Sequence, residues 1–325
     1  LCIQSAKTLK TSPKNVFFVM KKSFKTSPDD NGKRIDSVIS AKFAECSRAK
    51  VKRLIETGAV SANGEKINEA KKKIKDITNI EISFPEKNNE KNITGEKIPL
   101  EIIYEDDSIL VINKPPGIIV HPGAGNQKGS IVNALVGRNE NFANNFEDQT
   151  RPGIVHRLDK DTSGCLVTAK TQEIQNILIK LFSSRQVEKK YLALTYRVPP
   201  HKEGVIDTFF GRHPVSRKKM SVLDFSPKRA ISEYKILKEI QIEGLPCAVV
   251  EINLKTGRTH QIRVHLAHIK SPVLGDKLYG GKQKISVPRQ VLHAWKISFP
   301  HPKHGKPMHF ESPIPQDFSS YAGRI

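Results

Sequence analysis

Cysteines are few in this chain and lie far apart. The four are Cys2, Cys46, Cys165 and Cys247, and none forms a Cys-x-x-Cys pair. This spacing excludes a thiolate zinc site and a disulfide framework, and it favours a reducing, cytoplasmic location. Long apolar runs are missing as well. None reaches the roughly 18 residues that a membrane span needs, which excludes an integral membrane protein.

Acidic residues are scarce relative to basic ones. The 325 residues include 54 Lys and Arg against 33 Asp and Glu, a net charge of +21 with a pI near 9.8. This excess indicates a polyanionic partner, either a nucleic acid or an acidic membrane surface. With 37% hydrophobic and 27% charged residues the composition is that of a globular chain, and its length favours two domains.

Two segments have compositions that predict little regular structure. Residues 1–31 begin with six lysines and no acid in the first 25 positions, so we expect a basic, disordered arm. Alternatively, the start site is placed too early, and Met20, which two lysines follow, is the natural start. A transit peptide fits less well, because arginine is absent from these positions. Residues 86–98 are almost entirely polar and predict a linker that contains the domain boundary.

Residues 32–85 predict a small α/β module. Apolar residues recur at helical spacing from Ile35 to Phe43, and Ser47 suits the N-cap of a second helix that ends at Gly58. A helix pair with a basic outer face is suited to gripping RNA phosphates, although a solvated charged face is the alternative. The basic residues of the second helix that we expect to contact RNA are Arg48, Lys50, Lys52 and Arg53.

This module resembles the S4 RNA-binding domain. The matching residues are Arg34-Ile35-Asp36, Ser47-Arg48 and the stretch from Leu54 to Gly64. The resemblance implies binding to structured RNA. Because S4 domains occur in many proteins, it does not identify an activity.

Residues 99–325 predict a mixed α+β domain on a large, mainly antiparallel β-sheet flanked by helices and loops. Helical spacing of apolar residues predicts helices near residues 174–181 and 262–269. Short apolar segments bounded by turn residues are typical of strands. We expect strands at residues 109–112, 166–167, 191–195, 249–254 and 291–299.

The densest cluster of reactive side chains lies in residues 151–164. Basic residues, among them His156 and Arg157, surround two carboxylates, Asp159 and Asp161, in a loop bounded by glycines. Rigid scaffolds often carry reactive groups on such loops. A carboxylate beside an arginine stays ionised, which suits a nucleophile or a base better than a general acid. A surface turn with a local ion pair is the alternative interpretation.

A second cluster, residues 256–268, holds three histidines and two arginines. On a helix, His260 and Arg263 lie close together. The spacing is not His-Glu-x-x-His and no thiolate or acidic ligand lies nearby, so we expect no metal site. Structural histidines, or phosphate contacts at a helix N-terminus, are the expected roles.

Both clusters resemble the RluA/RluD family of pseudouridine synthases. The segment from Gly153 to Gly164 matches the family signature, and the segment from Thr256 to His265 matches a second stretch. Further matches, in the family's order, are Tyr104–Asp107, Val111–Pro115, Val120–Gly125, Lys189–Ala193, Gly211–Pro214, Gly275–Asp276, Tyr279–Gly281 and Leu292–Ala294. Gly211–Pro214 and Pro313–Asp317 are similar to the RluD branch, which modifies large-subunit (23S) rRNA.

The resemblance implies a role for each matching residue. Asp159 is implied to be the catalytic aspartate that acts at the ribose of the target uridine. Arg263 is implied to pair with Asp159, and Tyr191 to lie against the uracil face. Arg157 is implied to help extrude the base or to fill its place. The other residues expected to bind substrate are His156, Arg258, His260 and Gln261.

The chain departs from the family at one strand end. It reads Thr195-Tyr196-Arg197, where the family commonly has glycine after Ala-Leu-Val. This departure makes the local turn uncertain and touches no residue implied to be catalytic.

The resemblance implies an isomerase that converts specific uridines of structured RNA, expected to be 23S rRNA, to pseudouridine by base flipping. The reaction breaks the bond from C1′ to N1, turns the uracil and rejoins it through C5, so no cofactor is expected. Whether Asp159 attacks C1′ or removes the C2′ proton stays open. RNA is the expected partner, with no membrane and no obligate protein partner.

Three alternative functions compete with this one. The first is the same reaction on a tRNA uridine. The second is an RNA-binding ribosome assembly factor with an idle pocket, against which the set Asp159, Tyr191 and Arg263 argues. The third is a glycosidase that uses Asp159 and Asp161 as paired carboxylates. One tryptophan, 6% aromatic residues and a net charge of +21 disfavour a neutral sugar substrate.

Overall fold

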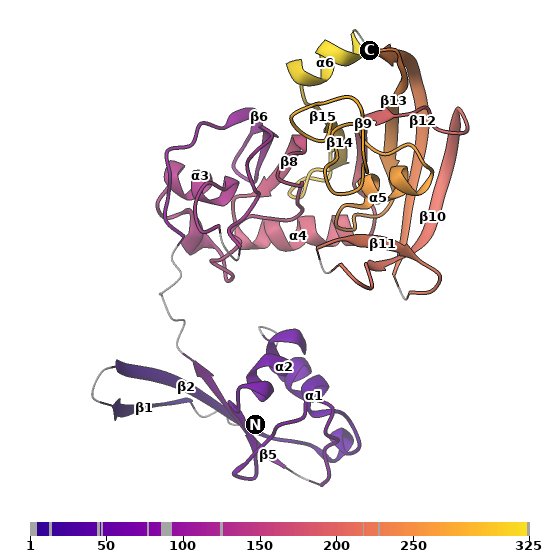
Figure 1. The fold of residues 1–325 in the computed structure, drawn as a ribbon. Coiled ribbons are helices and arrows are strands. Elements are labelled where there is room, and N and C mark those ends of the chain that lie inside the picture. The colour runs from indigo at the N-terminus through magenta and orange to yellow at the C-terminus, as the bar shows by residue number, and fades with distance from the viewer. Residues whose placement is uncertain are drawn as a thin grey trace. The chain divides into compact units, whose positions relative to one another are not determined.

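The computed structural model describes two compact units, Leu1–Glu90 and Lys91–Ile325 (Figure 1). The break between them falls inside the predicted linker, of which residues 86–92 lie outside the described part. The structure describes residues 5–323 except 13–14, 44–45, 47, 77, 86–92, 124–125, 217 and 227. No helix in this described part is long and apolar enough to cross a membrane.

The first unit is a five-stranded sheet with two α-helices packed on it, and it also contains a short 3₁₀ helix. Its strand order is β1-β2-β5-β3-β4, and every pairing is antiparallel. The strands are β1 (Ser5–Ser12), β2 (Asn15–Lys25), β3 (Val60–Ala62), β4 (Glu65–Lys66) and β5 (Asn79–Pro85). The helices are η1 (Pro28–Asp30), α1 (Ile35–Lys42) and α2 (Arg48–Glu56).

The N-terminal segment differs from the disordered arm expected over residues 1–31. It forms β1 and β2, and β2 pairs with β5 from Val19 opposite Pro85 to Lys25 opposite Asn79. Phe24 is buried among the apolar residues of α1 and α2. The module therefore begins before residue 32, because a strand of the same sheet precedes it.

Both helices of the first unit form for the reason expected from their spacing. Ile35, Val38 and Ile39 recur on one face of α1 and are buried. Val51 and Ile55 do the same on α2, which is followed by Gly58 with a positive φ of 69°. Ser47, the predicted N-cap, lies outside the described residues. The strands β3 and β4 form an antiparallel hairpin around Asn63-Gly64.

The second unit is built on a ten-stranded sheet. Its order is β11-β10-β12-β13-β9-β14-β8-β7-β6, with β15 paired to β14. The pairing of β14 with β8 is parallel and the others are antiparallel. The strands are β6 (Glu101–Glu105), β7 (Ile109–Lys114), β8 (Ser163–Ala169), β9 (Glu188–Tyr196), β10 (Glu203–Arg212), β11 (Met220–Leu223), β12 (Arg229–Ile242), β13 (Leu245–Leu254), β14 (Leu292–Pro300) and β15 (Pro307–Glu311).

Helices cover both faces of this sheet. They are α3 (Ile131–Arg138), η3 (Phe142–Asn145), α4 (Gln172–Ser183), α5 (Gln261–His268) and α6 (Gln316–Ala322). Figure 1 shows β10, β12 and β13 as a long wall, with α5 on its inner side. Along β9 successive side chains enter different cores: Tyr191 packs with the core that includes α4 and α5, and Leu192 with the core that includes α6.

The predicted fold class is confirmed. The chain is α+β, with a small N-terminal module and a large, mainly antiparallel mixed sheet flanked by helices. The central strands are buried on both faces, and they fix the loops and helix ends from which the reactive side chains project.

Candidate active site

A tight loop before β8 carries Asp159. Hydrogen bonds from other parts of the chain fix the backbone carbonyls of this loop. The carbonyl of Asp159 accepts the N–H of Thr162 at 3.1 Å. The carbonyl of Lys160 accepts both the N–H of Gly117 and the Nζ of Lys114, each at 3.0 Å. Because these acceptors are occupied by the scaffold, the loop has little freedom to move the Asp159 side chain.

Lys114 is the buried centre of this arrangement. It is the last residue of β7 and is fully buried. Its Nζ also donates to the carbonyls of Pro115 at 2.8 Å and Ile118 at 2.9 Å. Burial lowers the pKa of Lys114 to about 7, and the three carbonyls oppose loss of the proton, since only the ammonium has three N–H donors. Lys114 thus ties two loops together.

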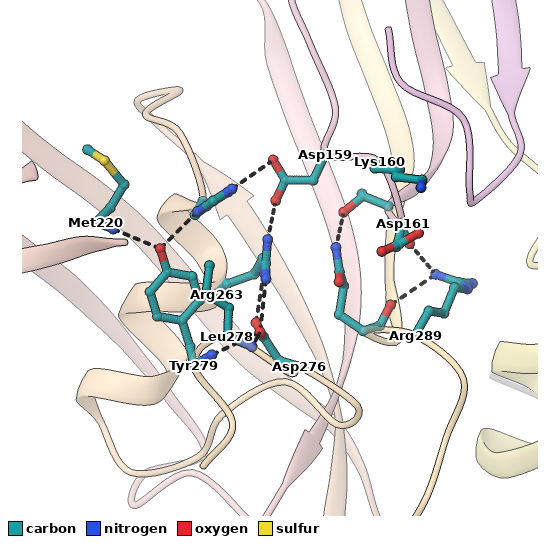
Figure 2. Close-up of polar contacts among 12 residues, drawn as sticks. Asp159, Lys160, Asp161, Met220, Arg263, Asp276, Leu278, Tyr279 and Arg289 are labelled. Carbon is teal, nitrogen blue, oxygen red and sulfur yellow. Dashed lines mark hydrogen bonds and ion pairs between the residues drawn. The ribbon is translucent and has the colours of Figure 1, made fainter. Parts of the chain in front are cut away.

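A second buried cation supports the other end of the loop. Arg289 donates from Nη1 to the carbonyl of Asp161 at 3.0 Å, as Figure 2 shows. Its Nε and Nη2 donate to the Asp317 carboxylate at 2.5 and 2.7 Å. Asp317 lies on α6, so the C-terminal helix helps to fix the loop that carries Asp159.

The Asp159 carboxylate is paired with Arg263, as expected. Arg263 Nη1 donates to Asp159 Oδ2 at 2.9 Å. The other edge of the guanidinium is held by Asp276, with Nε to Oδ2 at 2.7 Å and Nη2 to Oδ1 at 2.9 Å. The exposed fractions of the three side chains are 17% for Asp159, 8% for Arg263 and 0% for Asp276. Figure 2 shows the guanidinium lying between the two carboxylates.

The charges of this group explain its pKa shifts. Burial alone would raise the pKa of Asp276, but the hydrogen bonds and charge of Arg263 hold it below the ordinary value. Burial alone would lower the pKa of Arg263, and Asp276 and then Asp159 raise it above the ordinary value. The guanidinium therefore keeps its charge, and Asp276 orients it so that Nη1 is aimed at Asp159.

His260, three residues before Arg263, also faces the Asp159 carboxylate. It precedes α5 with a positive φ of 59°. Its Nε2 lies 3.8 Å from Asp159 Oδ1, and its Nδ1 lies 2.8 Å from the hydroxyl of Tyr279. That hydroxyl accepts the backbone N–H of Met220 at 2.8 Å. A chain of contacts thus runs from β11 to the carboxylate (Figure 2).

Tyr191 and Asp159 line the same cavity. The cavity has a volume of about 530 Å³ and is also lined by Arg157, His260 and Arg263. Tyr191, on β9, has 7% of its surface exposed. Burial, and then the charge of Asp159, raise the pKa of Tyr191, so the phenol stays neutral. A neutral aromatic side chain, an anionic carboxylate and a cation meet at one place, which can bind and react with a polar ring.

Comparison with known proteins assigns both parts of the chain to described families. A family model described as RNA pseudouridylate synthase matches residues 108–268, and one described as S4 domain matches residues 33–76. Ribosomal large subunit pseudouridine synthase D of Xanthomonas campestris pv. campestris is 38% identical over 299 residues, 88% of this chain and 87% of that protein. The chain belongs to the RNA pseudouridylate synthase family. The expected isomerase class and the S4 resemblance are confirmed.

Further relatives and solved structures agree. Ribosomal large subunit pseudouridine synthase D of Nitrosomonas europaea is 38% identical over 304 residues, 91% of this chain and 85% of that protein. Human RNA pseudouridylate synthase domain containing 1 superposes with a TM-score of 0.56 at 25% identity, covering 67% of this chain and 85% of that one. Human RNA pseudouridylate synthase domain containing 4 superposes with a TM-score of 0.51 at 28% identity, covering 67% of this chain and 90% of that one.

Two residues expected to bind substrate in this synthase use their polar atoms on the protein instead. His156 Nε2 accepts the N–H of Val167 at 2.9 Å, and its ring stacks on Phe182. Burial lowers the pKa of His156 to about 3, so it is not a cation for phosphate. Gln261 accepts two hydrogen bonds, from Thr256 and from the backbone N–H of Arg258. It also donates two, to the backbone carbonyl of Ile231 and to Ser232. Both residues shape the cavity wall.

Several basic residues that line the cavity are exposed, as a nucleic-acid contact requires. Arg157 and Arg258 were expected from the sequence, and both are exposed. Three further cations that line the cavity were not predicted: Arg185 follows α4 and is exposed, Lys189 lies on β9 and is half-buried, and Lys255 follows β13 and is exposed. Their signal is weak, because single basic residues at the ends of elements are common on protein surfaces.

The basic residues expected on the S4 domain all lie on α2 and are exposed: Arg48, Lys50, Lys52 and Arg53. Arg48 pairs with the buried carboxylate of Asp36 at 3.4 Å, and Lys52 pairs with Glu56 at 3.6 Å. These pairs are partly solvated, so phosphates can compete for the same cations.

Four residues that hold the site were not given a role from the sequence: Lys114, Asp276, Tyr279 and Arg289. Three of them lie in or beside stretches that resemble the family, so a signal was present for Lys114, Asp276 and Tyr279. Their roles depend on partners as far as 128 residues away, some of them backbone carbonyl groups, which a residue pattern does not display.

Proposed function

We propose that this synthase isomerises specific uridines of large-subunit (23S) rRNA to pseudouridine, with the target base flipped into the cavity and Asp159 acting on its ribose. The pairing of Asp159 with Arg263 beside Tyr191, inside a basic rim, carries the proposal. The choice of RNA draws on the relatives, whose names state a ribosomal large-subunit substrate. The predicted cytoplasmic location stays a prediction.

Binding comes before chemistry in this account. A uridine inside a stem must leave its stack, at a cost of a few kcal/mol. Phosphate contacts from the rim residues Arg157, Arg258 and Arg185 offset that cost, and the exposed face of α2 adds further contacts on the same RNA. Arg157, two residues before Asp159, fills the space in the RNA stem that the flipped base leaves.

Chemistry then depends on one oxygen atom. Arg263 occupies Oδ2 of Asp159, which leaves Oδ1 to act on the sugar. That oxygen either attacks C1′ or removes the C2′ proton, and each route breaks the bond to N1 of uracil. The freed uracil turns against Tyr191, whose neutral ring binds a base face by stacking. It rejoins the sugar through C5, a step that releases Asp159 from C1′ or returns the C2′ proton, according to the route. The proton on C5 is then lost and N1 gains one.

The substrate is tested by mapping pseudouridines across cellular RNA. The strains carry the wild-type protein, no protein, or Asp159→Asn. We expect one or a few 23S rRNA positions to lose pseudouridine without the protein and to stay unmodified with Asp159→Asn. Loss confined to tRNA would replace the proposed substrate. An unchanged map, together with altered ribosome assembly, would favour an assembly factor with an idle pocket.

A further inference from the structure

The two oxygens of Asp159 are in different surroundings. Oδ2 accepts the charged hydrogen bond from Arg263 at 2.9 Å. Oδ1 has His260 Nε2 at 3.8 Å, which is too far for a direct hydrogen bond. No hydrogen bond between described residues ends on Oδ1. A gap is left between an oxygen acceptor and a ring nitrogen at the wall of the cavity.

The position of His260 is enforced by its neighbours. The residue has a left-handed backbone, which side chains adopt at a cost of roughly 1–2 kcal/mol. Tyr279 lies 2.8 Å from Nδ1 and packs on Arg263, with the guanidinium carbon 5.2 Å from its ring centre. Tyr279 therefore touches both side chains that flank Asp159.

The hydrogen bonds of Tyr279 decide which ring nitrogen of His260 carries the proton. The phenol oxygen accepts the N–H of Met220, and Nδ1 is the one hydrogen-bond acceptor that the described residues offer to the hydrogen of the phenol. The proton of a neutral ring consequently lies on Nε2. The negative charge of Asp159 favours the same tautomer, because it would repel a lone pair on Nε2.

The His260 ring is neutral at physiological pH. Burial lowers its pKa, and the positive charges of Arg263 and Arg157 lower it further against the opposing effect of Asp159 and Asp276. A single N–H donor therefore points across the gap to Oδ1.

We propose that the Nε2–H of His260 donates to the 2′-hydroxyl of the target ribose, and that Tyr279 is a positioning residue which sets the tautomer for this contact. The inference rests on the proposed function. A hydroxyl accepts one hydrogen bond and donates another, so it can bond both Nε2–H and Oδ1. The 2′-hydroxyl is attached to the carbon next to C1′, where Asp159 acts. The contact makes the site selective for RNA over DNA.

The experiment compares two stem-loops that carry uridine or 2′-deoxyuridine at the mapped target position. Single-turnover rate constants are measured as a function of enzyme concentration for wild type, His260→Asn, His260→Gln and Tyr279→Phe. Asn tolerates the left-handed backbone but lacks a donor at the position of Nε2, whereas the Gln amide reaches it. Phe keeps the ring on Arg263 and removes the hydroxyl. His268→Asn, at the exposed end of α5, is the matched control.

We expect wild type and His268→Asn to prefer the ribose by about tenfold or more, as one hydrogen bond provides. The preference should fall to about twofold in His260→Asn, recover partly in His260→Gln and shrink about threefold in Tyr279→Phe. A His260→Asn preference as large as that of wild type, or a wild type without preference, overturns the inference and leaves the proposed function intact. No pseudouridine from wild type on uridine RNA overturns both.

Discussion

At the residue scale, Asp276 orients the guanidinium of Arg263 toward the carboxylate of Asp159. Asp276→Asn keeps the shape but removes the charge that holds the Nε–Nη2 edge of the guanidinium. We expect the single-turnover rate to fall at least about tenfold with RNA affinity within threefold, and stability to fall by about 3 kcal/mol. Single-turnover assays and urea unfolding measure these effects. Asp207→Asn is the control, since Asp207 pairs with Arg229 at the surface and should cost less than about 1 kcal/mol.

Lys114 is expected to matter through the carbonyls that it satisfies. Lys114→Met leaves those of Pro115, Ile118 and Lys160 without this donor, so we expect a loss of about 3 kcal/mol. Thermal unfolding measures the loss. Lys160→Met is the control, because it makes the same change on an exposed side chain. It should leave the melting temperature within about a degree of wild type. Equal effects of the two substitutions would contradict this role.

At the element scale, the end of β9 carries a strained residue. Arg197 has a φ of +78° and an exposed side chain, at the strand end where the family commonly has glycine. Arg197→Gly should stabilise the protein by about 0.5–1 kcal/mol, since glycine adopts this backbone without a Cβ clash. Arg138→Gly, at the end of α3, should destabilise it by about 1 kcal/mol. Denaturant unfolding of both variants tests the account, and a destabilising Arg197→Gly would refute it.

The elements that the sequence predicted are those with clear periodicity. The helices expected near 174–181 and 262–269 form over 172–183 and 261–268. The strands expected at 109–112, 191–195, 249–254 and 291–299 form over 109–114, 188–196, 245–254 and 292–300. The strand β12 was not expected, because its buried positions Ala230, Ser232 and Tyr234 are small or polar and do not read as an apolar alternation. The N-terminal strands were missed because a lysine-rich composition masks pairing that only the partner strand β5 reveals.

The site shows the same difference between what a local sequence pattern predicts and what only tertiary packing reveals. Asp159 and Arg263 lie 104 residues apart, and their pairing was expected from the family resemblance rather than from any local pattern. Asp276, which orients the arginine, and the Tyr279–His260 contact follow only from tertiary packing. Gln261 matched the family motif, but hydrogen-bond saturation by the protein is visible only in the structure.

At the scale of the whole molecule, the two units should respond differently to acid. All 11 histidines lie in Lys91–Ile325. Burial lowers the pKa of His265 and His293 to about 4, from about 6.5 in an unfolded chain. Between these pH values the unfolded chain binds protons that the folded chain does not, so stability present above pH 6.5 is lost as the pH falls toward 4. Each histidine should cost about 1.4 kcal/mol per pH unit.

Hydrogen exchange resolved by peptide, at pH 6.5 and pH 5, tests this difference. We expect protection to fall in strands of the second unit, such as β13, and to change little in β5 of the first unit, after correction for the intrinsic exchange rate. Equal loss in both units would contradict the assignment of acid sensitivity to buried histidines.

The S4 domain should contribute to RNA affinity more than to chemistry. Neutralising Lys50, Lys52 and Arg53 on the exposed face of α2 removes charge without touching the apolar face. We expect about tenfold weaker binding to full-length rRNA at physiological salt and a shallower salt dependence, with an unchanged single-turnover rate on a short stem-loop. Unchanged affinity for full-length rRNA would show that this face does not bind the substrate.

The central claim is that the anionic oxygen of Asp159 performs the chemistry while the rest of the protein holds the RNA. It is tested most directly by single-turnover tritium release from 5-tritiated uridine RNA with Asp159→Asn at saturating enzyme, alongside the affinity for the same RNA. We predict release at least about a thousandfold slower than wild type with affinity within threefold. Release within tenfold of wild type would contradict the claim.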